Sequence, residues 1–155
     1  MDRAAAHFPA DLLYLIEHQV WARLDGPQQA TVGITSLGIR LAGEIYMCRP
    51  KPVGTEVVQG RSVGVVELAK SIVSVKTPFS GQVVEINPRL ASQPELVHTD
   101  PYGEGWLARL QLSAPESECA ALVMGDAVWP AMEAHARLYR IGLEPQQQPQ
   151  PEHGA

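Results

Sequence analysis

The stretch VVELAKSIVSV, residues 65–75, constrains the fold more than any other part of the chain. Two runs rich in β-branched residues lie on either side of a short polar stretch that contains Lys70. β-branched residues favour strands, and two such runs separated by a few polar residues predict a hairpin. We therefore predict a β-hairpin whose tip presents Lys70 to solvent.

Similar segments recur along the chain and predict a mainly β domain. We expect further strands at 20–24, 30–35, 43–48, 81–87 and 105–113. We expect short helices at 36–43, 87–96, 118–124 and 129–141, where caps or Ala-rich sequences occur. Short strands at close spacing are typical of a β-sandwich or flattened barrel, here with a C-terminal helical segment.

Length, charge and composition set the broad class. The chain has 155 residues and a net charge of −5, which favours one domain and disfavours nucleic acid as a partner. It contains no apolar run of the ~20 residues that a membrane helix needs, and its start does not resemble a signal peptide, so we expect a cytoplasmic location. We predict an N-terminal extension (1–11), a domain (12–143) and a disordered Pro/Gln-rich tail (144–155).

The usual signatures of enzymes and metal sites do not occur in the sequence. It has no GxSxG, P-loop or GxGxxG motif, its two cysteines form no CxxC pair, and its five histidines lack metal-ligand spacing. We therefore predict no catalytic residue and no metal site. We expect a protein that is itself a substrate of other enzymes.

Lys70 has two interpretations. A solvated lysine at a turn needs no functional explanation, although the chain has only three lysines. An exposed lysine, with a pKa near 10.4, is mostly protonated and is a poor nucleophile on its own. Its accessibility would instead let a partner enzyme attach an acyl group to the amine, which makes the side chain the root of a swinging arm.

Several motifs in the same order resemble the glycine cleavage H-protein family. The resemblance is carried by HQVWARLDGPQQATVGIT, LAGEIY, PVGTEV, VVELAKS, PFSGQVVEIN, NPRLASQPELV and PYGEGWL. It implies a lipoyl-type barrel-sandwich hybrid and lipoic acid attached as an amide to Lys70 by a lipoate–protein ligase. The family's lysine motif falls on Glu67, Ala69 and Ser71, which we expect to contribute to ligase recognition or to the surroundings of the arm. Biotin carriers place methionines beside their lysine, so Ala69 and Ser71 favour lipoate.

Two positions depart from the family pattern. The family has a glutamate just before its tryptophan and an aspartate four residues after the lysine, near the resting place of an arm that carries a cationic aminomethyl group. Here Val20 and Ser74 occupy these positions. Burying a cation requires a paired charge, so the cargo is expected to differ unless Glu17 or Glu67 compensates.

Three hypotheses follow. The first, which the two missing acids favour, is a lipoyl carrier of sulfur intermediates with a heterodisulfide-reductase-like complex, similar to an H-like branch in sulfur oxidation. The second is an H-protein that works with the glycine cleavage enzymes, and the third is an unlipoylated interaction module. Cys48 and Cys119 are candidates for thiol chemistry under the first hypothesis, although free cysteines are often simply small core residues. We expect these two cysteines to be too far apart to form a disulfide.

Overall fold

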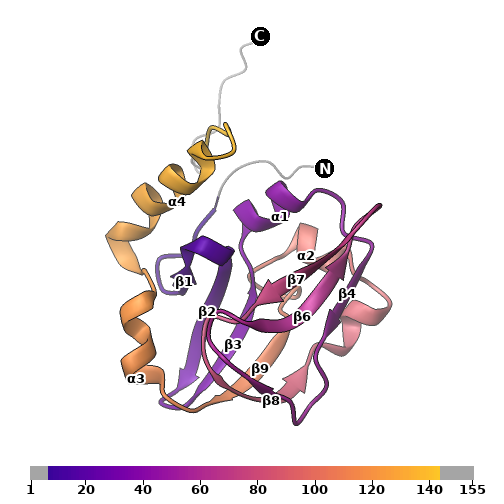
Figure 1. The fold of residues 1–155 in the computed structure, drawn as a ribbon, viewed down its shortest axis with the longest axis vertical. Helices are drawn as coiled ribbons and strands as arrows, with labels where there is room; N and C mark the ends of the chain where they lie inside the picture. The colour runs from indigo at the N-terminus through magenta and orange to yellow at the C-terminus, as the bar shows by residue number, and fades with distance from the viewer. Residues whose placement is uncertain (1–6, 144–155) are drawn as a thin grey trace.

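The computed structural model describes residues 7–143, and its strands form two sheets (Figure 1). The six-stranded sheet has the order β1-β2-β3-β9-β8-β5, and the three-stranded sheet has the order β4-β6-β7. The predicted tail lies outside the described residues, as does most of the N-terminal extension. The strands are β1 (Leu13–Leu15), β2 (Val20–Gly26), β3 (Gln29–Ile34), β4 (Met47–Pro50), β5 (Glu56–Val57), β6 (Ser62–Glu67), β7 (Ile72–Lys76), β8 (Gly81–Ile86) and β9 (Ala108–Leu112).

Short helices connect and cover the sheets. The α-helices are α1 (Ser36–Ala42), α2 (Leu96–Thr99), α3 (Pro115–Glu118) and α4 (Val128–Arg137), and the 3-10 helices are η1 (Ile16–His18), η2 (Pro88–Ala91), η3 (Cys119–Ala121) and η4 (Gly125–Ala127). The capping predicted for α1 is confirmed: the side chain of Thr35 accepts a hydrogen bond from the amide of Gly38 (2.9 Å), and Gly43 ends the helix at φ 86°.

The main hydrophobic core lies between the sheets. Val32 and Leu110 of the larger sheet belong to one buried cluster with Val63 and Val75 of the smaller sheet. A second cluster joins the N-terminal strands to α4, which lies on the outside of the molecule near β1 (Figure 1). The prediction of a mainly β domain with short helices and a C-terminal helical segment is therefore confirmed.

The helix expected at 118–124 is wrong. The chain forms the short helices α3 and η3 and then runs extended, so that Val123 pairs with Tyr14 through two backbone hydrogen bonds of 2.9 Å. The Ala-rich composition favoured a helix, but these pairs extend the sheet beside β1, a strand that the sequence analysis also missed.

One strand prediction needs a smaller correction, and a second strand contains an irregularity. The strand expected at 43–48 begins only at Met47, because Ile45 lies outside the ladder and donates its amide to His98 Nε2 (3.0 Å). In β8 the regular alternation of faces is interrupted by a bulge between Val83 and Glu85, so Glu85 is exposed and pairs with Arg109 (2.8 Å).

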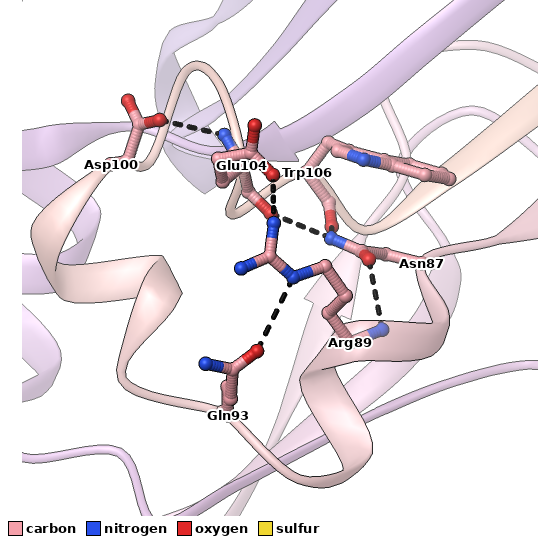
Figure 2. Close-up of polar contacts among 6 residues, drawn as sticks. All are labelled: Asn87, Arg89, Gln93, Asp100, Glu104 and Trp106. Atoms are coloured by element: carbon pink, nitrogen blue, oxygen red, sulfur yellow. Dashed lines mark hydrogen bonds and ion pairs between the residues drawn. The ribbon is translucent and has the colours of Figure 1, made fainter.

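A polar network fixes the long connection between β8 and β9, as Figure 2 shows. Asn87 caps η2 through the Arg89 amide (3.1 Å) and donates its side-chain amide to the carbonyls of Glu104 (2.7 Å) and Trp106 (2.8 Å). Arg89 pairs with Glu104, whose backbone amide donates to Asp100 (2.8 Å). The connection holds α2, and through its contact with Ile45 it supports one wall of the site described next.

Candidate functional site

Lys70 lies in a four-residue loop at the tip of the β6–β7 hairpin. The last ladder pair is Glu67 with Ile72, and the amide of Leu68 then donates to the carbonyl of Ser71 (2.8 Å). The side chain of Leu68 is partly buried against the main core, which anchors the loop from below. The hairpin therefore presents Lys70 at the surface from a loop whose backbone is held in place.

Lys70 differs in exposure from the other two lysines. Its side chain is exposed, whereas Lys51 and Lys76 are partly buried. Ala69 and Ser71 are also exposed at the tip, while Glu67 is held by an ion pair with Arg49 (2.8 Å). An enzyme that approaches the tip therefore meets small neighbours beside Lys70.

A cleft of about 400 Å³ opens beside this hairpin. Its walls come from η1 and β2, from α1, from the β6–β7 hairpin and from α4. The lining residues are Glu17, His18, Gln19, Val20, Ile34, Gly38, Leu41, Ala42, Ile45, Val66, Leu68, Val73, Ser74, Val75, His135 and Tyr139. Most of these side chains are apolar, so the cleft suits a largely hydrophobic group.

The structure places Val20 and Ser74 in the wall of this one cleft. Val20 is 2% exposed and belongs to the main core. The hydroxyl of Ser74 is buried and has no hydrogen-bond partner among the described residues. A buried hydroxyl without a partner costs free energy. The roles of both residues toward an arm remain predictions.

Gln19 is a polar cleft residue that the sequence analysis did not include in the site. It is 5% exposed and has a left-handed backbone (φ 54°). Its side-chain carbonyl accepts from Thr35 Oγ1 (2.6 Å), and its NH₂ donates to the Ile16 carbonyl (2.8 Å) and to Met132 Sδ (3.3 Å). The network depends on the packing of η1, β3 and α4 against one another. It could not be predicted from the sequence, because Gln19 alone carries no sequence signal.

The cleft is within reach of an acylated Lys70. Ser74 follows Lys70 by four residues, which corresponds to about 13 Å at ~3.3 Å per residue of extended strand. A lipoyl-lysine side chain has roughly a dozen bonds of ~1.5 Å and spans well over 10 Å when extended. The far end of such an arm can therefore lie near Ser74 without any movement of the hairpin.

Two ionisable side chains near the C-terminal end of the described chain line the cleft, namely His135 in α4 and Tyr139 just after this helix. Desolvation lowers the pKa of His135 below its usual value, and the nearby Glu17 carboxylate opposes that shift. His135 is therefore mainly neutral at pH 7. Tyr139 is 54% exposed and extends the wall toward solvent.

The two cysteines are free and lie outside the cleft lining. Cys48 is 4% exposed in β4, and burial raises the pKa of its thiol to about 12. Cys48 is therefore protonated at neutral pH and is a poor nucleophile, which argues against the thiol chemistry considered for it. Cys119 is partly buried in η3, and its role remains a prediction.

Within residues 7–143, no group of three or more His, Cys, Asp or Glu side chains is placed to hold a metal ion. No helix in the same part of the chain is long and apolar enough to cross a membrane. Two facing sheets, a lysine presented on a hairpin and an adjoining apolar cleft define the class of mainly β carrier domains of the lipoyl barrel-sandwich type.

Comparisons with known proteins narrow this class to a family. A family model described as "Glycine cleavage H-protein" matches residues 12–134. A "Probable glycine cleavage system H protein 2" from Sulfurisphaera tokodaii is 40% identical over 121 residues, which cover 77% of this chain and 81% of that protein. A "Glycine cleavage system H protein" from Symbiobacterium thermophilum is 44% identical over 110 residues, which cover 71% and 84%.

A solved structure agrees. The crystal structure of a glycine cleavage system H protein from Mycobacterium marinum matches with a TM-score of 0.62 and 33% identity, over 68% of this chain and 87% of that one. The chain belongs to the glycine cleavage H-protein family. Proteins of this family are carriers without catalytic activity of their own, and they hold lipoate covalently on a lysine.

Proposed function

We propose that Lys70 carries the lipoyl group and that the arm transports an aminomethyl group between the enzymes of glycine cleavage. The observation that supports this most directly is the exposure of Lys70 at a hairpin tip beside an apolar cleft, in a family whose members carry lipoate. The amide removes the charge of the lysine, so the arm can enter the cleft without burying an ammonium ion.

Lys70 would hold the lipoyl group as an amide, and the apolar cleft beside the hairpin would receive the arm. The group would supply a disulfide that accepts the methylene carbon of glycine at one sulfur when a partner enzyme releases CO₂. The other sulfur would take up a proton, so that the two electrons lost by glycine would reduce the disulfide.

Mass spectrometry tests this proposal directly. The protein is produced with lipoate and a lipoate–protein ligase and is then incubated with glycine and glycine-decarboxylating partner enzymes. We expect one lipoyl adduct, lost in Lys70→Ala and retained in Lys51→Ala and Lys76→Ala, followed by the mass of the aminomethyl group. An adduct that survives Lys70→Ala would move the site elsewhere, and a protein that is never lipoylated would be an interaction module instead.

A second candidate function is a carrier of sulfur intermediates that works with a heterodisulfide-reductase-like complex. The specific observation in its favour is the neutral inner wall of the cleft, where Val20 and Ser74 stand in place of two acids of the family pattern. A sulfur atom bound to the dithiolane needs no counter-ion.

The two functions differ in what loads the arm. Lipoylated protein is offered glycine with its partner enzymes when the dithiolane is in its oxidised, disulfide form, and a thiosulfate-derived sulfur donor when it is in its reduced, dithiol form. Stable sulfur adducts together with no glycine-derived adduct would favour the sulfur carrier. Glycine loading at the rate of an ordinary H-protein in the same assay would exclude it as the main function.

A further inference from the structure

The inner part of the cleft has no group to balance a cationic cargo. Gln19 and Val20 are buried and uncharged, and the Ser74 hydroxyl is neutral. An ammonium ion that leaves water without a partner costs several kcal/mol. A protonated amine on the arm therefore has to find its counter-charge elsewhere around the cleft.

Glu17 is the one carboxylate among the residues that line the cleft in the described chain. It lies in η1, two residues before Gln19, and its side chain is 81% exposed. It therefore lies at the mouth of the cleft, where a carboxylate remains hydrated and keeps its charge at little cost.

His135 faces this mouth from α4, which packs against η1. The titratable residues of the lining are Glu17 and His18 from η1, His135 from α4 and Tyr139 just after α4, whereas α1, β6 and β7 contribute none. His18 Nε2 lies 3.9 Å from Glu17 Oε1, so His18 is a cation beside Glu17 only when it is protonated. No lysine or arginine lines the cleft, and Lys70 is neutral once it is acylated. At neutral pH, Glu17 thus has no permanent cation near it in this cleft.

We propose that Glu17 is the counter-charge for a protonated amine on the arm, and that the two histidines of the lining, His18 beside it and His135 on the facing wall, compete for this carboxylate when they are protonated. The inference rests on the proposed function of Lys70 and adds the residue that distinguishes a charged cargo from a neutral one. The cargo nitrogen remains at the mouth, while the apolar part of the arm fills the inner cleft.

The first test compares how long the aminomethyl group is retained. Lipoylated protein is loaded with glycine, separated from the partner enzymes, and followed by intact mass at pH 7.5 and low salt. We expect Glu17→Gln to lose the group about two to five times faster than the unaltered protein, the range for an exposed ion pair. The matched control Glu116→Gln changes an exposed glutamate of α3 outside the cleft lining and should leave the rate unchanged.

The second test measures how the rate of aminomethyl loss depends on pH and on salt. A purely structural role of Glu17 would not produce this dependence. Protonation of His18 and His135 in mild acid places cations beside Glu17, so loss from the unaltered protein should accelerate as the pH falls below neutrality. His18→Gln and His135→Gln should each weaken this acid limb, and the double variant should flatten it. High salt should bring the unaltered protein close to Glu17→Gln.

The outcomes separate this inference from the proposed function. If the lipoylated protein never takes up a glycine-derived group, the proposed function fails first. If it loads normally but Glu17→Gln retains the group as long as the unaltered protein does, only the role of Glu17 is overturned. An acid limb that persists in the double variant His18→Gln/His135→Gln would overturn the role of the two histidines.

Discussion

The amide of Leu68 donates to the carbonyl of Ser71 across the loop that presents Lys70, at 2.8 Å. The loop is thus closed by backbone atoms and by the partly buried Leu68 side chain, and the lysine side chain takes no part in it. We predict that Lys70→Ala changes the free energy of unfolding by less than about 0.5 kcal/mol while it abolishes lipoylation. Urea unfolding measures the first effect and intact mass the second. A large loss of stability would mean that Lys70 is a structural residue.

Gln19→Glu should destabilise the protein by about 1–3 kcal/mol at pH 7. A carboxylate can still accept from Thr35, but it cannot donate to the Ile16 carbonyl or to Met132, and it would be buried. Burial raises the pKa of the introduced acid above its unfolded value, so the loss should shrink as the pH falls toward 4. Gln28→Glu, at an exposed turn position, is the control and should cost little at either pH.

Ser74→Ala should leave the stability of the unlipoylated protein unchanged or raise it by up to about 1 kcal/mol. Its buried hydroxyl has no partner among the described residues, so removing it loses no hydrogen bond. Thr35→Val is the contrasting variant, because the Thr35 hydroxyl serves Gly38 and Gln19 and its loss should cost about 1–3 kcal/mol. A Ser74→Ala variant that is as damaged as Thr35→Val would show that Ser74 has a structural partner.

The alkaline stability of the protein should depend on Cys48. Burial raises the pKa of the Cys48 thiol in the folded protein to about 12, from 9.0 for an unperturbed thiol. The contribution of this residue to stability is therefore complete below pH 9 and declines as the pH rises toward 12. Cys48→Ala should reduce the slope of stability against pH in this range, although it also removes core volume. In the native protein, a disulfide reagent at pH 8 should react with Cys119 before Cys48, and equal rates would contradict the burial of Cys48.

The β6–β7 hairpin and the capped helix α1 could be predicted from sequence because their signals are local. The tip that carries Lys70 follows from two β-branched runs, and α1 follows from Thr35 and Gly43 at its ends. Local signals failed at 118–124, where pairing between Val123 and Tyr14 outweighed helix propensity.

The candidate site could be predicted only in part from the sequence, for the same reason. Val20 and Ser74 were predicted to belong to the site because they depart from a family pattern, and the structure places both in the lining of one cleft. Gln19 and His135 could not be recognised as part of it, because their place depends on how α4 packs across η1.

The burial of Cys48 has a consequence for the chemical inertness of the carrier. A lipoyl disulfide is opened by any thiolate that reaches one of its sulfurs, and the rate depends on the thiolate fraction and on access. The Cys48 thiol is protonated at neutral pH, is buried in β4 and is not among the residues that line the cleft. A lipoyl arm that folds back onto its own domain therefore meets no reactive sulfur from this residue, and its disulfide remains available for exchange with a partner protein.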